Sequence, residues 1–231
     1  MYRMIAPMKQ ITSAPPDGAD RPTVFIVDDD VSVRESLELL IASAGWQPLL
    51  FHSAQAFLEV TPATMPSCLV LDVNLPDLNG LDLQTTIALN GSRIPIIFVS
   101  GFGDVPMTVK ALKGGALDFL TKPIDPTALL KAIESALLKS EALLREEEEL
   151  QTLRRCFDAL TPREREVMSG VIKGLMNKQV AHELDISEIT VKAHRGQVMR
   201  KMSARSLPEL VNMAAKLRTE DSPEVGPAAL R

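Results

Sequence analysis

Short apolar runs alternate with amphipathic stretches through the first half of the chain. Runs rich in Val, Ile, Leu and Phe predict strands at residues 23–27, 47–50, 68–71, 95–99 and 117–120. The segments between them carry apolar residues at helical spacing, which predicts helices at residues 31–44, 54–59, 79–89 and 105–114. Strands that alternate with helices in this way are typical of a parallel sheet that helices cover on both faces.

The run at residues 94–99 is almost entirely apolar, as expected of a central strand that is buried on both faces. Five strands with five helices predict an α/β domain of the flavodoxin-like (βα)5 class, with a five-stranded parallel sheet in the order 2-1-3-4-5. In such a sheet the site lies beyond the carboxyl ends of strands one and three, where the strand order reverses. The residues that follow these two strands are therefore the first candidates for a site.

One long helical pattern covers residues 126–155. It contains two pairs of leucines spaced by seven, Leu137 with Leu144 and Leu143 with Leu150. This spacing is a feature of coiled coils, whereas the four glutamates at 146–149 interrupt the apolar seam and favour a solvated helix between two domains. Both interpretations stay open at this point.

Four shorter helices are predicted in the last part of the chain. The first begins at Thr161, which can be its N-cap, while Pro162 occupies the first helical position and Glu164 can complete a capping box. The other three are predicted at residues 177–184, 188–202 and 206–217. Because only three or four residues join the second and third of these helices, this all-α four-helix domain fits a helix-turn-helix.

Charge is distributed unevenly along the chain, whose formal net charge is -5. Residues 159–218 contain 11 Lys and Arg against 6 Asp and Glu, so the back of the chain is basic and the front acidic. This asymmetry indicates two domains with different partners. We predict a disordered extension at 1–21, an α/β domain at 22–125, a long linker helix at 126–158 that includes the last helix of the α/β domain, a helical domain at 159–218 and a disordered tail at 219–231.

No apolar stretch approaches the roughly 20 residues that a bilayer-spanning helix needs. The first residues also lack the continuous apolar core of a secretory signal. The two cysteines, Cys68 and Cys156, are far apart and show no metal-binding spacing. These features predict a cytoplasmic protein with two reduced thiols and no membrane partner.

Three carboxylates and one lysine follow predicted strands. Asp28 and Asp29 follow the first strand, Asp72 follows the third, and Lys122 comes just after the fifth. Because the carboxyl ends of parallel strands meet at one edge of a sheet, these side chains are expected to form an acidic pocket. Carboxylate oxygens are preferred ligands of Mg²⁺ and Mn²⁺, so this pocket would hold a divalent cation and orient a phosphoryl donor.

Asp72 can act as the nucleophile that takes a phosphoryl group, while Lys122 and the Ser100 hydroxyl contact the phosphoryl oxygens. Each residue also has a plainer explanation. Asp72 alone fits a turn before Pro76, Lys122 alone fits a surface lysine, and Asp30 fits a helix N-cap. Their joint placement at several strand ends favours the functional interpretation.

Four motifs stand at these strand ends: Val27-Asp28-Asp29-Asp30, Leu71-Asp72-Val73-Asn74-Leu75-Pro76-Asp77 with Asn79-Gly80, Val99-Ser100-Gly101, and Phe119-Leu120-Thr121-Lys122-Pro123. With them, residues 22–140 resemble the receiver domain of bacterial two-component response regulators. The resemblance implies that a sensor histidine kinase phosphorylates Asp72. It implies a metal site formed by Asp28, Asp29, Asp72 and the backbone carbonyl of Asn74.

The same resemblance implies that Ser100 and Phe119 form a switch pair that responds to the phosphoryl group held by Lys122. It also implies a cis peptide before Pro123. Asn74 and Phe102 flank the pocket, and we expect them to influence how fast the phosphate is hydrolysed.

The predicted helix at 188–202 has a basic outer surface. Val191, His194, Val198 and Met202 recur at helical spacing and are expected to face the core of the small domain. Lysines and arginines lie around the rest of the helix, where they can neutralise DNA phosphates. The plainer alternative is a solvated basic face. We expect His194 to pack or to cap rather than to bind a metal.

The motifs Leu160-Thr161-Pro162-Arg163-Glu164, Asn177-Lys178, Thr190-Val191-Lys192 and Arg200-Lys201-Met202 are similar to those of the LuxR-type helix-turn-helix. With the receiver in front, the chain is similar to response regulators of the NarL/FixJ group and, within it, to the FixJ-like branch. The similarity implies DNA contacts by Lys178, Thr190, Lys192, Ala193, Arg195, Gly196, Arg200 and Lys201. It implies a dimer surface formed by Leu207, Leu210, Val211 and Ala214, unless these residues only close the core of the small domain.

These features predict a transcription factor that phosphorylation switches on. The phosphorylated chain would dimerise, bind promoter DNA and regulate transcription with RNA polymerase, and the resemblance favours activation. We expect no enzyme activity beyond assistance to its own phosphorylation and dephosphorylation. Two other hypotheses stay open. One is a phosphatase of the haloacid-dehalogenase type, which normally needs an aspartate at the position of Asn74, and the other is a phosphate sink with an idle DNA-binding domain.

Overall fold

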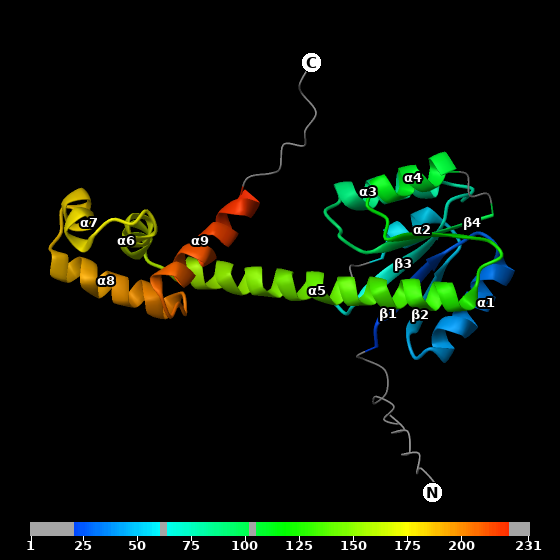
Figure 1. Ribbon diagram of the computed structural model, residues 1–231, viewed down its shortest axis with the longest axis horizontal. Coiled ribbons are helices and arrows are strands. Elements are labelled where there is room, and N and C mark those ends of the chain that lie inside the picture. Colours follow the sequence, from blue (N-terminus) through cyan, green and yellow to red (C-terminus); the bar gives the residue numbers. More distant parts are fainter. Residues whose placement is uncertain (1–20, 61–63, 102–104, 222–231) are drawn as a thin grey trace, which may run out of the picture. The chain divides into compact units, whose positions relative to one another are not determined.

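The structure is a computed structural model that describes residues 21–60, 64–101 and 105–221, without the side chains of residues 219–221. Apart from Arg21, the expected extension at 1–21 lies outside the described residues, as do most of the expected tail and Phe102. The chain divides into two compact units, Met1–Leu144 and Arg145–Arg231 (Figure 1).

Within the described residues, the first unit contains a five-stranded parallel sheet. Its strands are β1 (Thr23–Val27), β2 (Gln47–Phe51), β3 (Ser67–Asp72), β4 (Ile96–Ser100) and β5 (Asp118–Thr121). The strand order is β2-β1-β3-β4-β5, and every pairing is parallel. The flavodoxin-like fold predicted from the sequence is therefore confirmed.

Helices cover both faces of this sheet. They are α1 (Val31–Ser43), α2 (Ala54–Leu58), α3 (Gly80–Leu89), α4 (Val105–Lys113) and α5 (Pro126–Asp158). Alternate residues of a strand point to opposite faces. Val24 and Ile26 therefore pack in one core with α1 and the start of α5, whereas Phe25 and Val27 pack in another with α2, α3 and α4. Burial on both faces explains why β1, β3 and β4 are largely apolar.

Helix caps hold the loops that follow β1 and β3. Asp30 accepts hydrogen bonds from the backbone N–H groups of Ser32 and Val33, so it is the N-cap of α1 and the plainer explanation holds for this residue. Asn79 caps α3 by accepting the N–H of Leu81 at 2.9 Å. Each loop is therefore fixed where its helix begins.

The first part of α5 is built into the first unit. Leu137 packs in the core of that unit, and the Ser140 hydroxyl accepts the N–H of Ser67 at 2.9 Å. Leu137 is therefore not available for an apolar seam between two chains, which disfavours a coiled coil that starts at this leucine. The glutamates at 146–149 are exposed to solvent.

The second unit is helical in its described residues. After the end of α5 come α6 (Pro162–Ile172), α7 (Asn177–Leu184), α8 (Glu188–Lys201) and α9 (Leu207–Asp221). Thr161 and Glu164 form the predicted capping box at the start of α6. Asp185 ends α7 in the left-handed backbone region with φ 52°, and Ser187 caps α8. The predicted helix-turn-helix is thus formed by α7 and α8.

The helix α9 is longer than predicted. It continues to Asp221, so residues 219–221 belong to the helix rather than to a tail. The next proline after Pro208 is Pro223, and a proline disfavours helical backbone in the residue before it, so the chain can stay helical to this point. None of the helices in the described ranges is long and apolar enough to span a membrane.

Candidate functional site

Three acidic side chains meet at the carboxyl edge of the sheet. Asp72 is the last residue of β3, and Asp28 follows β1 directly. One carboxylate oxygen from each of these residues and one from Asp29 all lie within 4.8 Å of one another. Asp28 and Asp72 are 2% and 6% exposed, whereas Asp29 is open to solvent. The N–H of Asn74 donates to Asp72 Oδ1 at 3.1 Å, so the loop after β3 turns back over the cluster.

Lys122 completes this cluster from the end of β5. Its Nζ donates to Asp28 Oδ2 and to Asp72 Oδ2, at 2.7 Å in each case. Its backbone N–H donates to the carbonyl of Ser100 at 2.8 Å, which joins the ends of β4 and β5. The Lys122–Pro123 peptide is cis, as predicted. The structure therefore gathers the predicted carboxylates and the predicted lysine in one place.

The charges of this cluster do not balance, because three carboxylates surround one ammonium. Burial raises the pKa of Asp28, and the hydrogen bond from Lys122 opposes that shift only in part. Burial acts to lower the pKa of Lys122, but its contacts with Asp28 and Asp72 outweigh burial, and the pKa is raised. Lys122 therefore stays protonated at neutral pH. The surplus negative charge on hard oxygen atoms is the donor set that suits a divalent cation such as Mg²⁺.

The two predicted switch residues lie on the neighbouring strands. Ser100 ends β4 and is fully buried, one residue beyond Val99, which pairs with Asp72 across the sheet. Phe119 on β5 is half-buried, and its ring centroid lies 6.2 Å from that of Phe98. Phe119 thus packs against the core that α4 covers. Ser100 and Phe119 therefore lie on the strands between Asp72 and α4.

Gly80 keeps the backbone around Asp72 closely packed, a role that sequence analysis missed. A Cβ atom at this position would lie 2.5 Å from the Asp72 carbonyl oxygen and 3.1 Å from the Val73 Cα. Both neighbours are backbone atoms, so no side-chain rotation relieves the contact, and only glycine fits. The Asn79-Gly80 pair of the third-strand motif was the signal that could have revealed it.

Two further residues support the loops of the cluster. Arg34 Nη1 on α1 donates to the backbone carbonyl of Asp28 at 2.6 Å. Asp77 accepts the backbone N–H groups of Ala54 at 3.3 Å and Gln55 at 3.0 Å, at the start of α2. These bonds, first the one from Gln55, lower the pKa of Asp77. Asp77 belongs to the motif that follows the third predicted strand, whereas nothing in the sequence indicated a role for Arg34.

The helix-turn-helix of the second unit presents many of the predicted DNA contacts to solvent. Val191, Val198 and Met202 face its core, as predicted, while His194 is only half-buried. The exposed members of the predicted DNA-binding set are Lys178, Lys192, Ala193, Gly196 and Arg200. These residues form a surface on α7 and α8 that is basic and open.

Thr190 and Arg195 from the same predicted set are partly engaged inside the unit. The Thr190 hydroxyl lies 2.8 Å from the hydroxyl of Ser187 at the start of α8. Arg195 is half-buried and donates to Asn177 Oδ1 at 3.1 Å, which joins α8 to α7. Their contacts with DNA stay predictions, and the structure adds a second role for Arg195 in holding the two helices together.

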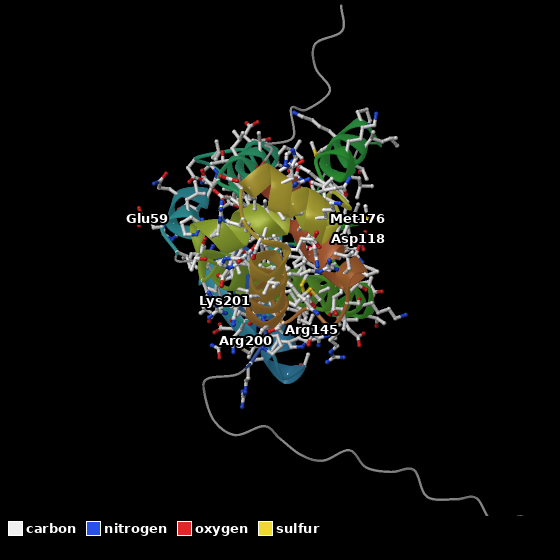
Figure 2. All side chains as sticks on the ribbon, turned by 90° about the vertical axis from the view of Figure 1, so that its left-hand side faces the viewer. Glu59, Asp118, Arg145, Met176, Arg200 and Lys201 are labelled. Atoms are coloured by element: carbon white, nitrogen blue, oxygen red, sulfur yellow. The ribbon has the colours of Figure 1, made fainter. Side chains whose placement is uncertain are left out.

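Lys201, another predicted DNA contact, forms an ion pair between the end of α8 and the start of α6. Its Nζ lies 2.7 Å from Glu164 Oε2, and the same carboxylate accepts the Thr161 N–H at 2.8 Å. Glu164 is 5% exposed, so its charge requires these partners. Figure 2 labels Lys201 and Arg200, which close α8. Thr161 and Glu164 were recognisable from local spacing, whereas Lys201 lies 37 residues further along the chain.

We expect acid to weaken the second unit through Glu164. The hydrogen bond from Lys201, and then that from the Thr161 N–H, hold the pKa of Glu164 below its ordinary value. The stabilisation is therefore complete above the pKa of an unfolded glutamate and is lost as the pH falls through the lower pKa of the folded state. Glu164→Gln should lower the free energy of unfolding at pH 7 and flatten its decline between about pH 5 and pH 3, as measured by urea denaturation.

Glu166→Gln is the matched control, because Glu166 lies on the same helix and forms an exposed ion pair with Arg163. This variant should keep the pH dependence of the parent chain. If Glu164→Gln lost stability in acid as steeply as the parent chain, the ion pair with Lys201 would not be the cause of that loss.

The four residues assigned to a dimer surface on α9 are mostly used inside the second unit. Leu210 and Ala214 are 0% and 7% exposed and belong to its core, and Leu207 is half-buried against that core. Val211 is 38% exposed. The alternative, that this face closes the small domain, therefore holds for Leu210 and Ala214 and corrects their assignment. An apolar helix face pairs with the nearest apolar surface, which here belongs to the same chain.

Two family descriptions match the chain. The response regulator receiver domain matches residues 24–134, and the luxR family of bacterial regulatory proteins matches residues 158–214. The matched ranges contain the acidic cluster and the helix-turn-helix, respectively.

Curated relatives match most of the chain. Nodulation protein W of Bradyrhizobium diazoefficiens is 48% identical, over 87% of this chain and 88% of its own length. The transcriptional regulatory protein FixJ of the same species is 43% identical, over 84% of this chain and 94% of its own length. Among solved structures, the response regulator StyR is 45% identical with a TM-score of 0.75, over 85% of this chain and 99% of that one. Full-length FixJ from B. japonicum is 40% identical with a TM-score of 0.51, over 87% of this chain and 99% of that one.

Proposed function

Because the chain belongs to the two-component response regulators of the NarL/FixJ group, with a receiver and a LuxR-type DNA-binding domain, we propose that phosphorylation of Asp72 switches its binding to promoter DNA. A sensor histidine kinase supplies the phosphoryl group, and the phosphorylated chain dimerises on DNA in the bacterial cytoplasm. The dimer then recruits RNA polymerase and activates transcription. The observation that carries the proposal is the Lys122 ammonium, held 2.7 Å from both Asp28 and Asp72.

The chemistry at Asp72 is a phosphoryl transfer to a carboxylate. One oxygen of Asp72 attacks the phosphorus of a phosphohistidine, the oxygen–phosphorus bond forms, and the phosphorus–nitrogen bond breaks. The histidine of the kinase keeps the electron pair of the broken bond and is reprotonated. Lys122 already contacts Asp72, so its ammonium is placed to offset the charge of the new phosphoryl group.

The carboxylates of the cluster would hold Mg²⁺, or Mn²⁺ in its place. Asp28, Asp29 and Asp72 supply hard oxygen ligands, and we assign the Asn74 carbonyl to the same set. When bound, the cation neutralises charge on the phosphoryl oxygens. Asp29 is exposed, so the site is open to solvent on the side of this residue. A phosphohistidine can approach Asp72 from that side.

The output of the receiver is a surface on α4 that becomes competent to pair. Val105, Val109 and Leu112 lie on one side of this helix and are 76%, 42% and 45% exposed. Ser100 and Phe119 connect Asp72 with this region, because they lie on the two strands next to α4 in the fold. We propose that the Ser100 side chain moves to the phosphoryl group and that the Phe119 ring then turns inward. The apolar side of α4 then packs against that of a second copy of the chain.

A charge placed on this side of α4 should prevent dimerisation. We expect the parent chain to shift from monomer to dimer when treated with acetyl phosphate and Mg²⁺, and Val109→Asp to stay monomeric, as measured by light scattering. Burial of an unpaired carboxylate in the interface is costly, so dimer affinity should fall by at least about tenfold. Binding of promoter fragments, followed by gel shift, should lose its response to the phosphodonor in parallel.

Leu39→Asp is the control, since Leu39 lies on α1 and is 74% exposed. It should dimerise like the parent chain. A Val109→Asp variant that dimerises normally would reject the α4 surface. If phosphorylation does not change DNA binding by the parent chain, the result would instead favour a phosphate sink with an idle DNA-binding domain.

We propose no catalytic role beyond assistance to phosphorylation and dephosphorylation of Asp72. The supporting feature is Asn74, which stands two residues after Asp72, where a haloacid-dehalogenase-type phosphatase needs a second acid. Asn74 is exposed and contributes its backbone N–H to Asp72 Oδ1 instead.

A further inference from the structure

Three residues on the outer face of α8 form an apolar line among charged and polar neighbours. Ile189, Ala193 and Gly196 follow one another at spacings of four and three, and all three are exposed. At 3.6 residues per turn, they lie about 140–160° around the helix from Val191, which is fully buried. This line therefore faces directly away from the core of the second unit.

None of these three residues has a hydrogen-bonding side chain. Ile189 is 83% exposed in the first turn of α8, and it is a large β-branched side chain held in water. A Cβ atom added at Gly196 would meet nothing within 4 Å, so the line is also unobstructed. Lys192 stands beside this line, and Arg200 continues it at the next helical spacing. Both are exposed, as is Glu188 at the start of the helix.

The chemistry of this surface identifies what can cover it. Basic side chains around an apolar centre suit a partner with phosphates at its edges and an apolar group between them. In the major groove of DNA, the C5-methyl group of thymine is the apolar feature that base edges present. The first turns of a recognition helix are also the part that reaches base edges.

We propose that Ile189, together with Ala193, recognises thymine methyl groups in the major groove of each half-site. Gly196 leaves room for the base edges to approach the helix backbone, and Lys192 and Arg200 hold the flanking phosphates. The inference rests on the proposed DNA-binding function, and it assigns Ile189 as a specificity-determining residue. This chain then reads part of its operator by apolar contact rather than by hydrogen bonds.

The test compares thymine with deoxyuridine, which lacks the methyl group. The full chain, treated with acetyl phosphate and Mg²⁺, is first used to select binding duplexes from a random pool. Each thymine of the selected half-site is then replaced singly by deoxyuridine, and affinities are measured by fluorescence anisotropy. We expect one or two positions at which the parent chain loses roughly fourfold in affinity, the effect of one buried methyl group.

For Ile189→Ser, deoxyuridine at those positions should lower the affinity by less than about twofold. Ile189→Val should keep a sizeable share of the loss of affinity seen with the parent chain. Leu89→Ser is the matched control, because Leu89 is also 83% exposed but lies on α3. It should reproduce the parent series.

An unchanged penalty in Ile189→Ser, or strong binding without any position sensitive to deoxyuridine, would overturn the assignment of Ile189. In the second case the apolar line would be left for a protein partner. Failure of the phosphorylated chain to select any sequence would overturn the proposed DNA-binding function itself, and the assignment with it.

Discussion

Replacing Asp72 with asparagine should reduce covalent labelling of the chain by acetyl phosphate to background. The amide preserves the shape of the side chain but lacks the nucleophilic oxygen that forms an acyl phosphate. Asp28 and Asp29 belong to the same cluster, so the labelling of Asp72→Asn also tests whether either of them takes the phosphoryl group instead. Intact-protein mass spectrometry in the presence of Mg²⁺ would count the phosphoryl groups on each variant.

Asp82→Asn provides the control, since Asp82 is an exposed aspartate on α3. It should be labelled like the parent chain. One stable acyl phosphate on Asp72→Asn would reject Asp72 as the acceptor. We expect Asp72→Asn to bind DNA weakly, and we expect acetyl phosphate not to change that binding.

Loss of Lys178 and Lys192 together should weaken DNA binding without affecting phosphorylation. Both side chains are exposed on the helix-turn-helix, so Lys178→Ala with Lys192→Ala removes charge at little cost to the fold. Each lost phosphate contact should reduce the steepness of the plot of log affinity against log salt concentration by about 0.9. Loss of both contacts together should reduce the affinity at moderate salt by roughly tenfold. Anisotropy titrations over a range of salt concentrations would measure both quantities.

The control for this pair is Lys173→Ala with Arg205→Ala, which removes the same charge from exposed positions of the second unit outside α7 and α8. A general electrostatic effect would give both pairs the same salt slope and would contradict the assignment. Arg195 is a poorer probe, because its hydrogen bond to Asn177 makes its removal a change in the packing of α7 against α8 as well.

The fold of the first unit and the clustering of its strand-end residues could be predicted from local patterns. The apolar runs marked the strands, and Asp28, Asp72 and Lys122 stood at their ends. Parallel strands bring such ends together at one edge, so proximity followed without any knowledge of the coordinates. The capping box at Thr161 and the turn before Ser187 were equally local, because caps act within three or four residues.

Contacts between distant residues were not predictable in the same way. Lys201 was assigned to DNA by the resemblance to the LuxR-type helix-turn-helix, yet its Nζ lies 2.7 Å from Glu164 Oε2. The resemblance assigned Leu210 to a dimer surface, with closure of the core as the alternative, and Leu210 is fully buried in its own unit. Periodicity shows that a helix has an apolar face but not what that face meets.

From its sequence alone, this protein was predicted to have a parallel α/β domain followed by a helix-turn-helix, with Asp72 at the end of the third strand, and its motifs added the resemblance to a receiver. Periodicity and short-range spacing carry that information, because secondary structure and strand direction depend mainly on near neighbours. Tertiary structure alone decided which side chains remain free to act. It paired Lys201 with Glu164, buried Leu210 and left Ile189 in solvent, because burial and ion pairing depend on groups that meet only after the chain has folded.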